Sequence, residues 1–261
     1  MNLLLALLVL FAAPEKDAKS YKLAYRFKEG DHYKESTSRM FKLDIVQDKT
    51  VASTHVVASE VLSRTVLETK QDRPVIERVV VNDFTRDVKK SPIQKEVGVT
   101  KSKAIGRTYV WRRVGDERWG LFTERAEVTN KYRPVVARLK NWRDNRLPKK
   151  AVKVGEAWRI PAAEYLETLG QAVPKGTTGN MDFKLVKVDD KGIATISIDG
   201  IWSYLEPGTR VVVTQSGTWT FDVKNGRDIK MDNTAKIDMS GNAEGKATLK
   251  LTRTVDWKKK G

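Results

Sequence analysis

The sequence predicts a mainly β fold. We expect a long antiparallel meander that forms a curved sheet, a half-barrel or two β-rich halves, with one or two short helices near the middle. Apolar and polar residues alternate with period two over most of the chain, which is typical of strands with one buried face. Turn signals separate these runs at short intervals, and helical spacing is confined to the middle. Because short turns join neighbouring strands, the pairing should be antiparallel.

The N-terminal part supplies the first alternating runs. Tyr21, Leu23, Tyr25 and Phe27 share one phase, which predicts a strand over 21–28. Glu29-Gly30-Asp31 should then turn the chain. Further strands are expected around 41–45, 55–67 and 75–84.

The C-terminal part alternates more regularly. Strands are expected around 194–199, 218–223, 229–239 and 247–251, with Trp219 in the core. The same inward face would line a pocket if the sheet curved around a cavity. Asn225-Gly226 predicts a hairpin with a two-residue type I′ turn, because both residues tolerate positive φ. Turns are also expected at 189–192 and 206–209.

Two helices are expected near the middle. Pro161 suits a first helical turn, and Ala162, Tyr165, Leu166 and Leu169 then share one face before Gly170. Residues 134–142 have a second run of apolar residues at helical spacing.

Residues 1–18 are expected to be a signal peptide or an N-terminal anchor. The apolar run from Leu3 to Ala13 is short for a membrane-spanning helix but fits the hydrophobic region of a secretion signal. A buried N-terminal strand is the alternative. We therefore expect an exported protein of the periplasm or the extracellular space, soluble or membrane-peripheral. The rest should divide into an N-terminal β-rich half, 19–145, and a C-terminal half, 146–261, with a helix and antiparallel strands.

Positive charge is concentrated in the basic segment 101–150. The chain has 49 Lys and Arg against 33 Asp and Glu, a net charge of +16. The basic segment holds fifteen basic and five acidic residues, so it supplies ten of the surplus charges. Such a field attracts anionic membrane surfaces, cell-wall polymers or nucleic acid. The chain has no cysteine, which excludes disulfides, thiol catalysis and cysteine-ligated zinc.

Two stretches resemble parts of exported bacterial proteins. The pattern P-x-x-x-V-x-V-G-x-x-W at 148–158 and the opening YKLAYRFKEGDHY at 21–33 resemble elements of uncharacterised β-rich envelope proteins. The layout is similar to that of the half-barrel lipoprotein and lipid carriers of the bacterial envelope. The resemblance implies an envelope location and an apolar ligand between sheet and helix, and it carries over no catalytic residue.

No motif indicates catalysis. His32 and His55, expected in a turn and at a strand start, have no metal-ligand spacing around them. A nucleophile elbow, a phosphate-binding glycine loop and a dinucleotide fingerprint are missing. Asp189 and Asp190 should cap a turn, although carboxylates from distant strands could still form a glycosidase pair. We expect a protein that is not an enzyme and needs no metal or cofactor.

The stretch TYVWRRVGDERWGLFT at 108–123 holds most of the candidate binding residues. It predicts a hairpin about Gly115-Asp116, which would set Arg112 opposite Trp119 and Trp111 opposite Gly120. The candidates for contact with a ligand or an anionic surface are Trp111, Arg112, Arg113, Arg118, Trp119, Arg138 and Trp142. Interleaved arginines and aromatics also suit nucleic acid, but the signatures of the common nucleic-acid-binding modules are missing.

Three functions fit these features. The first is a non-enzymatic envelope protein that binds a lipid or another apolar ligand and contacts anionic surfaces. The second is a structural or protein-interaction module with a solid core. Nucleic-acid binding is third, since an exported protein seldom meets nucleic acid.

Overall fold

A computed structural model describes residues 19–47, 50–91, 97–101, 104–114, 118–122, 146–168 and 173–258. In the N-terminal half the strands are β1 (Ser20–Tyr21), β2 (His32–Gln47), β3 (Thr50–Lys70), β4 (Arg73–Ser91), β5 (Val97–Lys101), β6 (Thr108–Val114) and β7 (Arg118–Phe122). The C-terminal half has β8 (Val152–Lys153), β9 (Ala157–Pro161), helix α2 (Ala162–Thr168), β10 (Thr178–Val188), β11 (Ile193–Glu206), β12 (Thr209–Asp222), β13 (Arg227–Gly241) and β14 (Glu244–Trp257).

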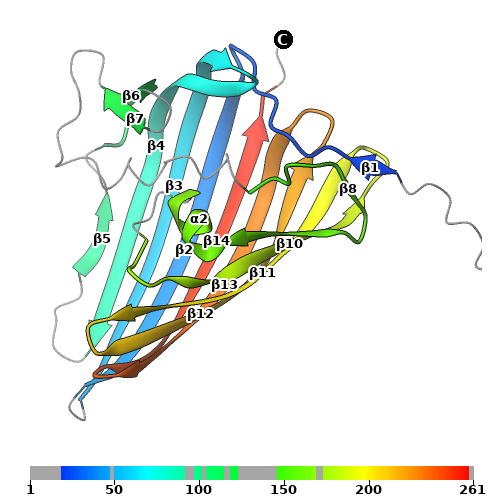
Figure 1. Ribbon diagram of the computed structural model, residues 1–261. Coiled ribbons are helices and arrows are strands. Elements are labelled where there is room, and N and C mark those ends of the chain that lie inside the picture. The colour runs from blue at the N-terminus through cyan, green and yellow to red at the C-terminus, as the bar shows by residue number, and fades with distance from the viewer. Residues whose placement is uncertain are drawn as a thin grey trace, which may run out of the picture.

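One large antiparallel sheet dominates the fold. Its strand order is β7-β6-β4-β3-β2-β14-β13-β12-β11-β10-β9, and β5 pairs with β4 beside this path. The sheet curves, and α2 lies on its inner side (Figure 1). A separate short ladder pairs β1 with β8. The predicted fold class, a curved antiparallel sheet with a short helix near the middle, is confirmed.

The two halves of the chain join through β2 and β14. These strands pair over fourteen positions, from Tyr33↔Trp257 to Val46↔Glu244. Each half is a meander, and this ladder makes them one continuous sheet. The division at 145/146 into separate units stays a prediction.

Several turns follow from their sequence as predicted. Glu206 pairs with Thr209 across Pro207-Gly208, and Gly208 has a φ of 75°, a conformation that costs glycine little. The Asp189 Oδ1 accepts hydrogen bonds from the backbone amides of Lys191 and Ile193 at 3.0 and 2.8 Å. Short polar side chains of this kind stabilise tight turns locally.

Two local predictions were wrong. Residues 22–28 alternate but form no strand, and only Ser20 and Tyr21 pair, with β8. The segment runs along the end of the sheet, where the Arg26 amide donates to the Gly226 carbonyl and the Phe27 amide donates to the Asp72 carbonyl. Asn225-Gly226 does turn the chain, but Asp222 pairs with Arg227, so the loop has four residues and Asn225 keeps a negative φ. The Asp222 carboxylate accepts from both the amide and the side chain of Asn225, which stabilises this longer loop.

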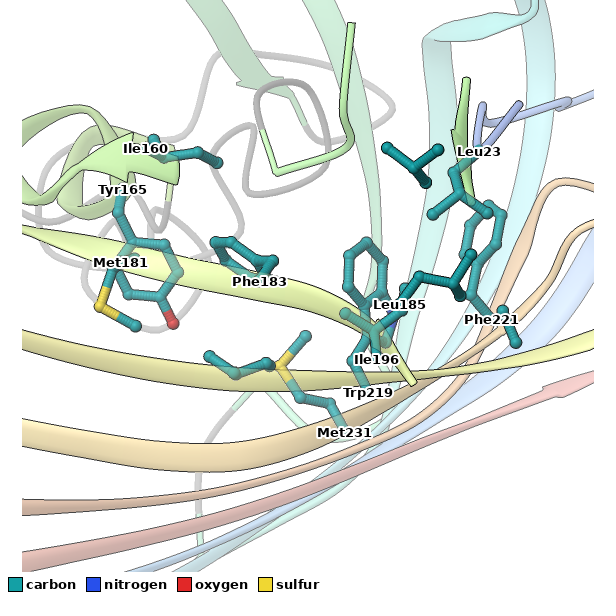
Figure 2. Packing of buried hydrophobic residues seen from close by; sticks show 13 residues of the cluster. Leu23, Ile160, Tyr165, Met181, Phe183, Leu185, Ile196, Trp219, Phe221 and Met231 are labelled. Atoms are coloured by element: carbon teal, nitrogen blue, oxygen red, sulfur yellow. The ribbon is translucent and has the colours of Figure 1, made fainter. Parts of the chain in front are cut away.

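The main core lies between α2, segment 21–25 and the inner face of β10–β13 (Figure 2). Its fully buried members include Phe183, Ile196 and Trp219, which confirms the core prediction for Trp219. Tyr165 of α2 packs on Phe183 with ring centroids 6.3 Å apart. The face predicted for α2 is therefore the buried one, since Ala162 and Leu166 are also inaccessible.

Other predictions lie outside the described residues. They are the signal-like segment 1–18 and the second helix at 134–142. In the part of the chain that the structure describes, no helix is long and apolar enough to cross a membrane.

Candidate functional site

An apolar patch covers the inner face of the sheet beyond α2. Its members on β11–β14 are in contact with one another and are buried or half-buried. They alternate in phase with Trp219 and Met231 of the core, so they face the same side as α2. We call this patch the apolar face, and it consists of Trp202, Tyr204, Val211, Val213, Ala235, Ile237, Met239 and Leu249.

The strand register extends this apolar face onto the N-terminal half. Leu249 pairs with Phe41, and Phe41 pairs with Val56. Leu43 and Ile45 follow in the same phase and are half-buried. Apolar side chains therefore run across six neighbouring strands, from β11 to β3.

The outer face of β12–β14 is mainly polar. Its exposed positions on β12–β14 include Thr214, Lys236, Asp238, Lys246 and Lys250. The inner side of these strands thus carries apolar side chains that are only partly buried, and contact between such side chains and water is unfavourable. The inner side is thus the candidate binding surface.

The tyrosines near this surface stay neutral at physiological pH. Burial raises the pKa of Tyr204, and the Glu206 carboxylate raises it further. Burial also raises the pKa of Tyr165, whose hydroxyl accepts a hydrogen bond from Gln215 Nε2 at 2.9 Å. Gln215 lies between Val213 and Gly217 on the inner face, so this bond fixes α2 at the border of the apolar face.

The space between sheet and helix is filled by side chains. Phe183 lies between Trp158, stacked at 5.6 Å, and Tyr165, and all three belong to or pack on the main core. A cavity of about 380 Å³ lies beside α2, and it is lined by segment 22–25, the turn at 71–73, residues 147–149 and Glu164 of α2. The resemblance implied an apolar ligand between sheet and helix, and the described side chains Phe183, Trp158 and Tyr165 pack there as part of the main core.

A buried ionic network lies on the same inner face, farther along the strands than the apolar face. The Arg253 Nε donates to Glu35 Oε1 at 2.6 Å, and its Nη1 donates to Asp228 Oδ2 at 3.0 Å. Arg64 lies between Glu35 and Glu77, at 3.0 and 3.1 Å. These five residues come from five neighbouring strands, β4, β3, β2, β14 and β13, so the network fixes the strands against one another.

Asp228 is the most connected carboxylate of this network. Its Oδ1 accepts from Trp219 Nε1 at 3.0 Å and from the Tyr25 hydroxyl at 3.1 Å. The Arg146 guanidinium stacks 4.7 Å above the Trp219 ring, with its Nη2 3.9 Å from Asp228 Oδ2. Three arginines thus meet three carboxylates, a balanced arrangement that makes the network a scaffold for the sheet and not a charged binding site.

Sequence reasoning missed this network, although a signal was present. Arg253 shares its phase with Leu249, Leu251 and Val255, and Arg64 shares its phase with Leu62. A charge at an inward position of an alternating strand indicates a buried partner.

The structure describes the predicted binding residues only in part. Trp111 belongs to a core cluster with Tyr109 and is 3% exposed, so it cannot touch a flat surface. Arg112 is exposed, with its guanidinium 5.9 Å from the Phe122 ring centroid. For Arg113, Arg118 and Trp119 only the backbone in β6 and β7 is described, while Arg138 and Trp142 lie outside the described residues. Their binding role stays a prediction.

The hairpin register differs from the predicted one by one residue. Arg112 pairs with Gly120 and Trp111 with Leu121, so three residues, not two, separate the paired Val114 and Arg118. His32 is the first residue of β2 and His55 lies within β3, and no group of three or more metal-ligating residues occurs among the described side chains.

Comparison with known proteins shows a likeness of fold alone. No protein-family model matches the chain, and no curated protein sequence matches it. A lipovitellin structure, described as showing lipid–protein interactions, matches with a TM-score of 0.52 at 7% identity, over 90% of this chain and 26% of that chain. The chain thus spans about a quarter of the lipovitellin chain. An outer membrane channel from Pseudomonas putida F1 matches at 8% identity over 90% of this chain and 97% of that one, but its TM-score of 0.29 carries no argument.

Proposed function

We propose that this protein is a non-enzymatic, exported envelope protein that holds a lipid or another apolar ligand on its apolar face. The observation that carries the proposal is the run of buried and half-buried apolar side chains across the inner face of β11–β14 and β2–β3, opposite an outer face that is mainly polar on β12–β14. A ligand that covered this surface would gain about 25 cal/mol for each Å² of apolar area removed from water. The fold shared with lipovitellin, a protein described in contact with lipid, supports the same proposal.

The packed core beneath α2 favours a second candidate, a structural or protein-interaction module. Phe183, Trp158 and Tyr165 leave that region filled with side chains, as a scaffold would need. The two candidates differ in whether a molecule of low mass covers the apolar face.

Native mass spectrometry of the protein purified from its own envelope tests the proposal. We expect a mass increase equal to that of one or a few lipid molecules, and binding again after delipidation and titration with a fatty acid or phospholipid. Denaturing mass spectrometry of the same sample gives the bare chain mass as the control. An unliganded mass under gentle conditions, with no binding on titration, would favour the structural module.

We propose further that the basic segment contacts an anionic membrane surface or cell-wall polymer. The exposed Arg112 supports this contact, because guanidinium groups bind phosphate readily. Replacing Arg112, Arg113 and Arg118 by Gln should weaken binding to vesicles that contain anionic lipid about tenfold or more, since each cation near such a surface contributes about 1 kcal/mol.

A matched control removes three exposed cations from the outer face of β13 and β14 instead, Lys236, Lys246 and Lys250. It should weaken the binding less. Equal losses in the two triple variants would indicate that only total charge matters.

A further inference from the structure

Three hairpin ends lie side by side at one end of the sheet. Glu206 and Thr209 close the β11–β12 hairpin, and Thr209 pairs with Gly241 at the end of β13. On the other side of the β13–β14 turn, Glu244 pairs with Val46 near the end of β2. The apolar face ends at this edge, which Figure 1 shows at the lower left of the sheet.

Hydrogen bonds fix two of these hairpin ends to each other. The Asn242 amide donates to the Gly208 carbonyl at 2.8 Å, and the Ala243 amide donates to Thr209 Oγ1 at 3.3 Å. The Asn242 side chain also packs closely on Gly208, where a Cβ would lie 2.0 Å from its Nδ2. The two hairpins thus present one surface.

Large apolar side chains are exposed on the outer face at this end. Val46 and Val51 pair directly and are 44% and 56% exposed, while Leu205 and Ile201 are 67% and 64% exposed. We call these four residues the rim. On the inner face the same end carries Ile45, Tyr204, Val211 and Met239. The outer face at this end thus carries exposed apolar side chains on β2, β3 and β11, with exposed polar residues of β12–β14 between them, namely Arg210, Ser240 and Glu244. The exposed apolar side chains suit an apolar surrounding better than water.

The charge around the rim is nearly balanced. The surrounding residues 42–46, 51–53, 204–210 and 238–246 hold three cations, Lys42, Arg210 and Lys246, against four carboxylates, Asp44, Glu206, Asp238 and Glu244. In a chain with a net charge of +16, this end offers no attraction to a polyanion. The charge at this end of the sheet therefore suits contact with a surface that has no net charge.

We propose that the rim docks on a zwitterionic phospholipid bilayer, where a lipid can pass between the leaflet and the apolar face. The proposal rests on the proposed lipid-binding function, and it identifies the place where a lipid from the membrane would reach the apolar face. The rim side chains enter the headgroup region, and the apolar face continues directly from the docked edge. A second copy of the chain is the competing occupant.

Flotation with vesicles of pure phosphatidylcholine tests the docking, because they offer nothing for the basic segment to bind. The variant Val46→Ser/Val51→Ser/Leu205→Ser should lose vesicle association at least about tenfold, since each exposed side chain loses its apolar transfer energy. The matched control Val154→Ser/Val186→Ser removes apolar residues that are 49% and 45% exposed elsewhere, and it should float like the unaltered protein.

A second measurement separates the docking from the proposed function. The triple variant should still bind a fatty acid delivered from solution with unchanged affinity, and its mass in solution should match that of the unaltered protein. Docking is overturned if the triple variant floats normally, if the unaltered protein binds fatty acid but does not float, or if the triple variant dissociates a dimer. Vesicle association without any fatty-acid binding would instead retain the docking and overturn the proposed function.

Discussion

Replacing Asp228 by Asn should reduce the free energy of unfolding by about 3–5 kcal/mol, the range for breaking a buried ion pair on one side. The substitution keeps the size of the side chain but removes its charge. Arg253 and Arg146 then face a neutral amide instead of a carboxylate. If the NH₂ group of Asn takes the place of Oδ1, the hydrogen bonds that Trp219 Nε1 and the Tyr25 hydroxyl donate to this oxygen are lost. Chemical denaturation followed by tryptophan fluorescence measures the loss.

Asp232→Asn is the matched control for this prediction. Asp232 lies on the same strand and accepts from Thr252 Oγ1 at 2.8 Å and Lys230 Nζ at 2.7 Å, but its side chain is 41% exposed. Exposed pairs of this kind contribute about 1 kcal/mol or less, so the control should unfold nearly as the unaltered protein does. Equal losses for the two variants would contradict the assignment of the network as the scaffold of the sheet.

Replacing Leu249 by Glu should weaken binding of an apolar ligand about 10- to 100-fold. Leu249 is half-buried at the centre of the apolar face, between Ala235 and Phe41 in the strand register. A ligand that covers a carboxylate there deprives it of water, and a polar group without a partner costs about 1–3 kcal/mol. Titration of the delipidated variant with a fluorescent fatty acid measures the change.

Thr248→Glu tests whether the effect belongs to the inner face. Thr248 is the preceding residue and points to the outer face, so the same charge should leave the affinity unchanged. Circular dichroism should show the same strand content for both variants. If Leu249→Glu binds as well as Thr248→Glu, the ligand does not lie on the apolar face.

Period-two alternation was sufficient to predict the sheet, because burial on one face of a strand leaves that pattern in the sequence. It was insufficient for segment 21–28, since Leu23 and Phe27 alternate because they pack across the core and not because they join a ladder. The Asn225-Gly226 pair correctly predicted where the chain reverses. The length of the loop, however, depends on the hydrogen bonds of Asp222, a residue that lies outside this pair.

The candidate site was predictable in kind but not in position. Period-two alternation does not distinguish a core face from a pocket wall, because both demand apolar residues. The pairing of Leu249 with Phe41, from opposite ends of the chain, is what makes the face continuous, and no local pattern contains it. Within 108–123, Trp111 is buried while its neighbour Arg112 is exposed, a difference that the interleaved arginines and tryptophans of the sequence do not reveal.

The ladder between β2 and β14 also sets an order of events during synthesis. Arg253 and Glu35, bonded across it, are 218 positions apart, so β2 waits with an open edge until nearly all later strands have left the ribosome. An unpaired edge of this length can pair with other chains, and distant contacts slow folding. A chaperone bound to β2 would protect this edge during the interval, and the sheet would close only after the last strand had arrived.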